Sequence, residues 1–233
     1  MNTVTEDYLK TIYKLQRTEG APVSTSDIAD RLDRSGASVT SMLDKLAERG
    51  LVEREKYKGA ELTAEGETVA LEVIRHHRLL EAYLTEHLDY SWSEVHDEAE
   101  RLEHHISEEF ERRVAEVLGH PTSDPHGDPI PGEDLSPPED DTSPLLDHGE
   151  GTSVTVARVA DRDEAELEYL ADAGITPGTH LDVTDVAPFG MVTVRTDDGE
   201  QSLPEDVAES IRVRESDPAE NGGAGRDEGV GGA

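Results

Sequence analysis

Proline is concentrated in one stretch of the chain, and this stretch limits what the chain can fold into. Seven of the twelve prolines lie between residues 121 and 144 of 233. Because proline lacks a backbone N–H and has a fixed φ angle, we expect neither a long helix nor a central strand there, but a boundary that is partly an extended linker. The residues from Glu215 onward hold six glycines and few apolar groups, which predicts a disordered tail. Two folded regions remain, 1–120 and about 151–214.

The charge is distributed unevenly. The chain has 54 Asp and Glu against 21 Lys and Arg, a formal net charge of −33. Residues 1–75 hold 11 basic and 14 acidic side chains, whereas residues 76–233 hold 10 and 40, and all five lysines precede residue 60. A carboxylate-rich, lysine-poor surface is typical of proteins that stay hydrated in concentrated salt, so we expect a halophilic acidic protein. The N-terminal third is spared the acidic excess, which indicates contact with a polyanion.

Several classes of protein are excluded by composition. The chain has no cysteine, which excludes disulfides, zinc-thiolate sites and thiol catalysis. No apolar run approaches the length of a membrane span, and no secretory leader opens the chain. We therefore expect a soluble, cytoplasmic protein without membrane contact.

The N-terminal region has the pattern of a winged helix-turn-helix. A helix is expected over 5–17 with Thr5 as a possible N-cap, and Ser24 opens a second helix with a sequence typical of a capping box. A third helix follows Gly36 and runs to about Arg49. Residues 51–57 and 60–63 then predict two short strands around a tight turn, which is the wing.

One face of the third helix and the tip of the wing are the predicted DNA contacts. Small hydroxyl side chains at a helix N-terminus can approach base edges and phosphates, and lysines at the wing tip can contact phosphates. The alternative is an ordinary solvated helix face. The expected DNA-binding residues are Ser35, Ala37, Ser38, Ser41, Lys45, Lys56 and Lys58.

Two further helices carry a candidate metal site. The first, from about Ala64 to His87, places His77 and Glu81 at i, i+4. The second is expected as one helix from near Ser91 to about Leu118. One of its faces carries His96, Glu100, Glu103 and His104. Carboxylate and imidazole without sulfur suit Mn(II), Fe(II), Co(II), Ni(II) or Zn(II). An ordinary charged helix face and a di-metal four-helix oxidase are the alternatives.

Five segments together resemble a known family. They are Glu6–Lys10 (EDYLK), Ser35–Val39 (SGASV), Arg75–Glu81 (RHHRLLE), Val95–His104 (VHDEAERLEH) and Gly127–Gly132 (GDPIPG). In this order they resemble the metal-dependent transcriptional repressors of the diphtheria toxin repressor and manganese transport regulator group, over about residues 5–135. A weaker similarity covers about 150–214.

The resemblance implies a mainly α homodimer with small β parts that binds operator double-stranded DNA when loaded with a divalent metal. Its expected parts are a winged helix-turn-helix domain (1–73), a helical dimerisation and metal-binding domain (74–135), a Pro-rich linker (136–150), an SH3-like, FeoA-like β-barrel (151–214) and a disordered tail (215–233). The implied primary ligands are Asp7, Glu100, Glu103 and His104. The implied ancillary ligands are His77, Glu81 and His96, completed by Asp163 and Glu166.

The resemblance leaves Mn(II) and Fe(II) as candidate metals, with manganese favoured. The iron-responsive branch has Met and Cys at the positions of Asp7 and Glu100. Compared with that thioether and thiol, hard carboxylate oxygens favour the binding of Mn(II). Lys10 replaces a Glu of the binuclear site in the manganese branch, so one strong site is expected near the first helix. His96 and the C-terminal region, by contrast, match the iron branch.

The C-terminal sequence supports a small barrel on its own. Residues 154–159, 181–186 and 191–195 predict short strands, and 164–173 predict an inserted helix. From the resemblance we expect a metal-activated repressor of manganese or iron uptake genes and not an enzyme. A winged-helix regulator of another ligand and, less favoured, a carboxylate-histidine metalloenzyme are the alternatives.

Overall fold

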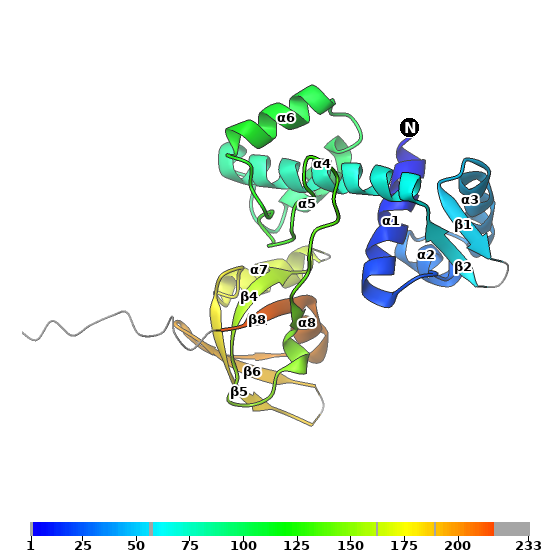
Figure 1. Cartoon of the computed structure of the whole chain (residues 1–233). Coiled ribbons are helices and arrows are strands. Elements are labelled where there is room, and N and C mark those ends of the chain that lie inside the picture. The colour runs from blue at the N-terminus through cyan, green and yellow to red at the C-terminus, as the bar shows by residue number, and fades with distance from the viewer. Residues whose placement is uncertain (1, 56–57, 162, 189, 217–233) are drawn as a thin grey trace, which may run out of the picture. The chain divides into compact units, whose positions relative to one another are not determined.

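A computed structural model describes residues 2–55, 58–161, 163–188 and 190–216 of the chain. The chain divides into two compact units, Met1–Asp140 and Asp141–Ala233 (Figure 1). Each unit has its own set of buried apolar side chains. The tail was predicted over 215–233, but Glu215 is the last residue of a strand; residues 217–233 lie outside the described residues, as do Lys56 and Tyr57 of the predicted wing tip. None of the helices in the described ranges is long and apolar enough to cross a membrane.

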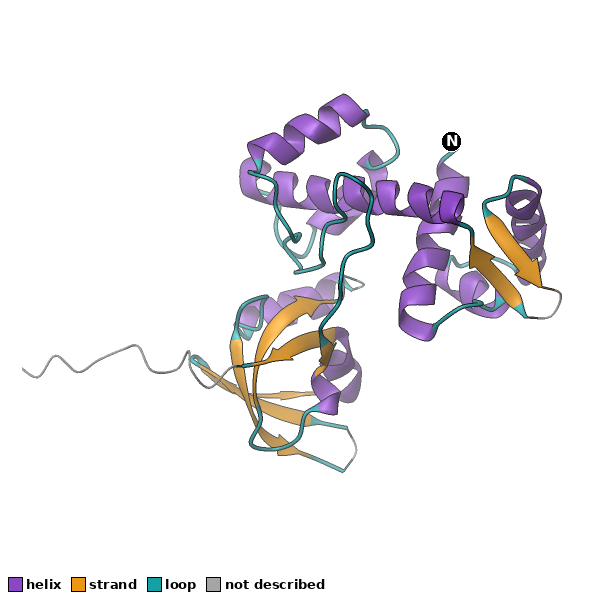
Figure 2. Ribbon diagram, viewed as in Figure 1, coloured by secondary structure: helices purple, strands orange, loops and turns teal. Residues whose placement is uncertain are grey.

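The first unit begins with the predicted winged helix (Figure 2). Its elements are α1 (Thr3–Glu19), α2 (Thr25–Arg31), α3 (Gly36–Glu48), β1 (Val52–Glu55) and β2 (Gly59–Leu62). The two strands pair antiparallel, with Val52 opposite Leu62. The wing is held close to the α1–α2 connection at Gly59, where a Cβ would lie 2.0 Å from the carbonyl oxygen of Val23 and φ is +116°. Only glycine accommodates both conditions.

Side-chain caps define where these helices begin. The hydroxyl of Ser24 accepts from the Asp27 N–H at the start of α2, and that of Ser35 accepts from the Ser38 N–H at the start of α3. The predicted cap at Thr5 is wrong, because α1 begins two residues earlier and Asn2 accepts from the Thr5 N–H. Thr5 is instead a buried residue within the helix.

The helical part of the first unit differs from the prediction, in which one helix runs from near Ser91 to about Leu118. It consists of α4 (Ala64–Leu88), α5 (Val95–Leu102) and α6 (Glu108–Val117). The chain leaves the helix after Leu102 and starts a new one at Ser107, whose hydroxyl accepts from the Phe110 N–H. A ring nitrogen of His76 on α4 lies 3.1 Å from the carbonyl oxygen of Glu103 in this break.

The first part of the proline-rich stretch folds back onto the helices of the first unit. The Ile130 N–H donates to the Thr122 carbonyl at 2.9 Å, and Ser123 bridges to Pro129. Asp124, His126 and Ile130 are buried there. Proline removes donors but leaves carbonyl acceptors, and these are used by Arg75, which donates to the Pro131 carbonyl at 2.6 Å.

The second unit is the predicted SH3-like domain. Its elements are β3 (Ser143–Pro144), the 3-10 helix η1 (Leu145–Asp147), β4 (Ser153–Val159), α7 (Glu164–Asp172), β5 (His180–Val186), β6 (Val192–Thr196), β7 (Gly199–Leu203), α8 (Glu205–Ser210) and β8 (Ile211–Glu215). The strands form one antiparallel sheet in the order β3-β8-β4-β5-β6-β7. Its two ends, β3 and β7, do not pair with each other among the described residues, so the sheet is not a closed barrel. β3 and η1 lie within the expected linker 136–150, and Leu145 there is fully buried.

Candidate metal centre

The first helix and the α5–α6 break meet at three potential metal ligands. Asp7 comes from α1, and Glu103 and His104 come from the break. The Nε2 atom of His104 lies 2.8 Å from Oδ1 of Asp7 and 3.3 Å from Oε1 of Glu103. One ligand atom from each of the three lies within 4.8 Å of the others. We call Asp7, Glu103 and His104 the primary group; all three were predicted as primary ligands.

The fourth predicted primary ligand, Glu100, lies apart from this group. Its side chain is 55% exposed, and its Oε1 lies 3.7 Å from Nζ of Lys10 and 3.6 Å from Nε2 of His96. Glu100 precedes the end of α5, whereas Glu103 and His104 follow it. Glu103 is the C-cap of α5 and keeps helical backbone angles, with its N–H donating to the Ala99 carbonyl, so Glu100 lies about one turn before it. The role of Glu100 as a ligand stays a prediction.

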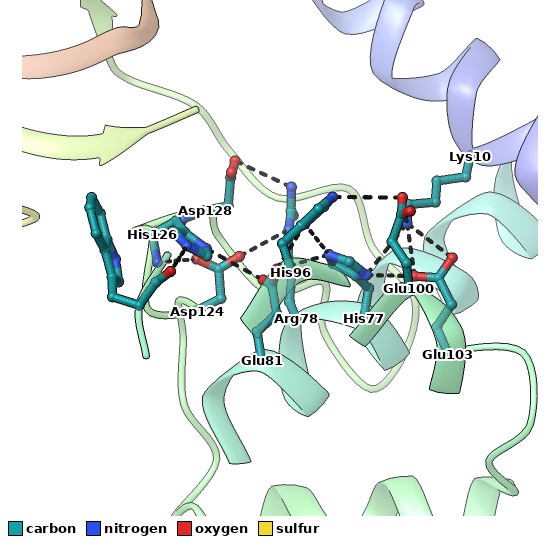
Figure 3. A network of polar contacts seen from close by, with 11 residues as sticks. Lys10, His77, Arg78, Glu81, His96, Glu100, Glu103, Asp124, His126 and Asp128 are labelled. Atoms are coloured by element: carbon teal, nitrogen blue, oxygen red, sulfur yellow. Dashed lines mark hydrogen bonds and ion pairs between the residues drawn. The ribbon is translucent and has the colours of Figure 1, made fainter. Parts of the chain in front are cut away.

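Lys10 reaches the primary group from α1, one turn after Asp7. Its Nζ donates to Oε1 and Oε2 of Glu103 at 2.9 and 2.8 Å (Figure 3). Burial acts to raise the pKa of Glu103, but the hydrogen bond with His77 and the charge of Lys10 outweigh it and lower that pKa to about 2. Burial raises the pKa of Asp7.

A second cluster, which we call the ancillary group, consists of His77, Glu81 and His96, as predicted. His77 and Glu81 lie one turn apart on α4, and His96 comes from α5. Oε1 of Glu81 lies 2.9 Å from Nε2 of His77 and 3.1 Å from Nδ1 of His96. The other ring nitrogen of His77, Nδ1, lies 2.6 Å from Oε2 of Glu103. His77 thus joins the ancillary group to the primary group (Figure 3).

A third cluster was not predicted. Asp124 and His126, from the proline-rich segment, lie with Glu81 so that one ligand atom of each is within 4.8 Å of the others, and all three are buried. We call these three residues the buried group. Oε2 of Glu81 and Nδ1 of His126 lie 3.7 Å apart, and neither atom has a hydrogen-bond partner among the described residues. The sequence signal was a histidine and an aspartate beside the Asp128-Pro-Ile-Pro-Gly132 turn, but loop residues have no periodicity that predicts which way they face.

Charge interactions in the buried group shift all three pKa values. Burial acts to raise the pKa of Glu81, but the facing histidines outweigh it and hold that pKa well below its usual range. Burial and the Glu81 charge raise the pKa of Asp124. Burial opposes protonation of His126, but Glu81 and Asp124 raise its pKa to about 9. The directions of these pKa shifts indicate that the carboxylates of the buried group favour a positive charge beside them.

The residues present fit a divalent cation. Buried polar atoms normally have a partner, and a cation bound by Oε2 of Glu81 and Nδ1 of His126 would supply one to both atoms. The primary group offers two carboxylates and an imidazole, a donor set that suits Mn(II), Fe(II) or Zn(II). Asp7, Glu103 and His104 also connect two parts of the first unit, so an ion held by all three would link them.

The two C-terminal ligand candidates have local roles in the second unit. The carboxylate of Asp163 caps α7 by accepting from the Glu166 N–H at 3.1 Å. The carboxylate of Glu166 accepts a hydrogen bond from the Ser210 hydroxyl. Their part in an ancillary metal site stays a prediction.

The predicted DNA-contact residues that the structure describes are exposed. Ser35 begins α3, and Ala37, Ser38, Ser41 and Lys45 follow on the same helix. Lys58 is exposed beside the wing tip, whereas Lys56 lies outside the described residues. Arg54 on β1 is engaged differently, since it donates to the carboxylate of Asp44 and to the Thr40 carbonyl on α3. It fixes the wing strand to α3.

Comparison with family models divides the chain into the winged helix, the helical part of the first unit and the second unit. Residues 1–60 match the N-terminal DNA binding domain of the iron dependent repressors, and residues 63–132 match their metal binding and dimerisation domain. Residues 143–215 match the FeoA domain. The model matches thus cover both the winged helix and the helices that carry the metal-ligand candidates.

Individual relatives match over nearly the whole chain. The diphtheria toxin repressor of Corynebacterium efficiens is 35% identical over 223 residues, which are 91% of this chain and 96% of that protein. The iron-dependent repressor IdeR of Mycobacterium tuberculosis is 35% identical over 222 residues, 90% and 96% of the two chains. Among solved structures, a manganese-dependent transcriptional repressor in complex with manganese is 40% identical with a TM-score of 0.86, covering 91% of this chain and all of that one.

A second solved structure, ScaR with bound Cd²⁺, is 31% identical with a TM-score of 0.80 and covers 91% of this chain and 99% of that one. Repressors whose names refer to iron and repressors whose names refer to manganese are thus similar to this chain to about the same degree. The likeness includes the FeoA domain as well as the two N-terminal domains. The chain therefore belongs to the iron-dependent repressor family, whose members are metal-dependent DNA-binding transcriptional repressors of metal homeostasis and not enzymes.

Proposed function

We propose that this chain acts as a homodimer and represses metal-uptake genes by binding operator DNA when Mn(II) or Fe(II), with manganese favoured, occupies the primary group. The observation that carries the proposal is the contact between Asp7 and His104. Asp7 lies on α1 of the winged helix, and His104 lies in the α5–α6 break of the metal-binding and dimerisation domain. A ligand held by both side chains fixes the disposition of the DNA-binding helices in the dimer.

The mechanism is a linkage between two binding equilibria. A ligand that binds one conformation better than the other shifts the population toward it, and the same coupling raises the affinity of each ligand in the presence of the other. A bound divalent ion would supply the positive charge that draws Asp7 toward Glu103 and His104. The spacing of the two α3 helices in the dimer would then match the spacing of operator half-sites.

Recognition of DNA rests on the exposed N-terminal end of α3. Ser35 and Ser38 offer hydroxyl groups at the start of the helix, where the backbone N–H groups favour a phosphate. Lys45 and Lys58 add two positive charges at exposed positions. Direct readout of bases should be modest because the proposed face has no Arg, Asn or Gln, and groove shape should contribute correspondingly more.

Manganese is favoured by the donor atoms of the primary group. Asp7 and Glu103 supply carboxylate oxygens and His104 supplies one imidazole nitrogen. Mn(II) binds more weakly than later divalent metals to most ligand sets, so a manganese-responsive site must avoid the soft donors that favour those metals. The chain has no cysteine to supply one.

We further propose that Glu81 is the shared member of an ancillary centre. Its two oxygens face different partners: Oε1 faces His77 and His96, and Oε2 faces His126. Because His77 also contacts Glu103, a charge at Glu81 acts on the orientation of that ring. Occupation of the ancillary centre should therefore strengthen binding at the primary group.

DNA binding at controlled free metal concentrations tests the function. DNA fragments would be selected from a random pool with the protein at saturating Mn(II), and their binding would be measured at matched free Mn(II) and Fe(II). We expect metal-dependent binding of a partly palindromic sequence, stronger with Mn(II), that Asp7→Ala abolishes. Glu19→Ala, which changes an exposed acidic residue on α1, is the control variant. Equal binding of the selected DNA with and without metal would contradict the proposal.

A further inference from the structure

Lys10 is a buried charge placed among candidate metal ligands. Its side chain is only 7% exposed, although it belongs to the residue class that is least often buried without a charged partner. Its partner is Glu103, a member of the primary group, and both oxygens of that carboxylate accept from the ammonium group. A buried ion pair of this kind leaves a costly unpaired charge when one partner is removed.

The surroundings of the Lys10 ammonium group are those that a metal ion takes. Besides Glu103, Nζ lies 3.5 Å from Nδ1 of His77 and 3.7 Å from Oε1 of Glu100. Carboxylates from two residues and one imidazole nitrogen therefore converge on a single cationic atom, which is supplied by the chain itself (Figure 3). His104 approaches the same Glu103 carboxylate through Nε2, 3.3 Å from Oε1.

We propose that Lys10 is a tethered cation that sets the metal threshold: its ammonium group neutralises Glu103 in the metal-free protein and competes there with a divalent ion. The inference rests on the proposed function only in assigning Glu103 to the metal site. Two positive charges that share one carboxylate repel each other, and the repulsion is strong where water is largely excluded. Metal binding must therefore overcome either the repulsion or the loss of the Lys10–Glu103 ion pair.

The pairing also holds α1 against the α5–α6 break without metal. Lys10 and Asp7 lie one turn apart on α1, so the Lys10–Glu103 contact brings Asp7 and His104 to their places beforehand. Lys10 then has two opposed effects. It stabilises the arrangement in the metal-free protein, and it weakens the affinity of that arrangement for metal.

Substitution of Lys10 separates these effects from a general structural role. Lys10→Met keeps most of the side-chain volume and removes the charge, whereas Lys14→Met makes the same change one turn later on α1 and is the matched control. In isothermal titration of the metal-free proteins with Mn(II) alone, Lys10→Met should bind the ion at least about tenfold more tightly than wild type does. Without metal, Lys10→Met should unfold at a lower temperature than wild type. Lys14→Met should leave both measurements unchanged.

A double variant keeps the test decisive if Lys10→Met is too unstable to titrate. Lys10→Met combined with Glu103→Gln removes both charges, so the metal-free double variant should unfold at a higher temperature than Lys10→Met alone. Unchanged or weaker Mn(II) binding by Lys10→Met, or no recovery in the double variant, would overturn the inference. Because these measurements contain no DNA, they can succeed even if the proposed operator binding fails; loss of Mn(II) binding by Asp7→Ala tests the site assignment separately.

Discussion

Glu6 holds the ring of His104 from the side opposite Asp7. Oε2 of Glu6 lies 2.6 Å from Nδ1 of His104, while Oδ1 of Asp7 lies 2.8 Å from Nε2 of the same ring. Two consecutive residues of α1 thus contact both nitrogens of one imidazole. A carboxylate on one ring nitrogen places the proton there and leaves the other nitrogen free to bind a metal.

Replacing Glu6 by Gln should weaken metal binding without removing a ligand. An amide holds the His104 ring less firmly, and changes of this kind typically cost about 10- to 100-fold in metal affinity. Titration of the metal-free protein with Mn(II) measures the effect, and Glu19→Gln, at an exposed position on the same helix, is the control. Equal affinities for wild type and Glu6→Gln would mean that Glu6 does not orient His104 for metal binding.

Replacing Asp7 by Met should change the order in which metals activate DNA binding. The substitution exchanges a hard carboxylate oxygen for a soft thioether, so the response should move from Mn(II) toward Fe(II) or Co(II), and Glu100→Cys should add to the shift. The measurement is DNA binding of wild type and variant at matched free concentrations of each metal. If both proteins rank the metals identically, Asp7 does not determine selectivity.

The stability of the metal-free protein should depend on pH through His126. Its pKa is raised from 6.5 to about 9, so the folded chain binds this proton more tightly than the unfolded chain does. The stabilising contribution is therefore fully present below pH 6.5 and is lost as the pH rises through 9. It amounts to at most ~3 kcal/mol of unfolding free energy.

Urea unfolding of wild type and His126→Gln between these pH values measures this contribution. The stability advantage of the wild type should shrink as the pH rises. His120→Gln, which replaces a histidine that is 59% exposed, controls for the loss of an imidazole. A difference between wild type and His126→Gln that stays constant with pH would show that folding does not raise the pKa of His126.

The affinity of this protein for DNA should fall less steeply with salt concentration than the affinity of a basic regulator does. Each phosphate that a lysine neutralises adds about −0.9 to the slope of log K against log salt. The chain has five lysines, of which Lys45, Lys56 and Lys58 are the ones predicted to contact DNA. Replacing both Lys56 and Lys58 by Gln should reduce the slope by ~1.8 if each contacts one phosphate. A steep slope that the double substitution leaves unchanged would place the phosphate contacts elsewhere.

The fold was predictable from the sequence wherever the periodicity and capping residues of a helix or strand determine where that element lies. The α2 cap at Ser24, the extent of α3 and the strands of the wing follow from residues within a few positions of each other. The break between α5 and α6 was missed because apolar spacing continues through it. The signal was present in Ser107, a good N-cap followed by Glu108 and Glu109, which favour the start of a helix.

The candidate metal site was predictable only in part, for a related reason. His77 and Glu81 lie on one uninterrupted helix, so their spacing places them together. Asp7 and His104 are far apart in the sequence, and only the family resemblance paired them. Asp124 and His126 belong to a loop whose direction is set by long-range contacts, such as the donation from the Trp92 indole N–H to the Pro125 carbonyl at 2.9 Å. No local pattern encodes that contact.

The folding back of the proline-rich segment also gives the protein an optical reporter. Trp92 is the single tryptophan of the chain, and its ring centroid lies 5.3 Å from that of His126, whose Nε2 lies 2.8 Å from the Trp92 carbonyl oxygen. Tryptophan emission, excited beyond the absorption of tyrosine, therefore originates beside the buried group and nowhere else in the molecule. Quenching of that emission by a paramagnetic ion would follow the loading of this centre in unlabelled wild-type protein.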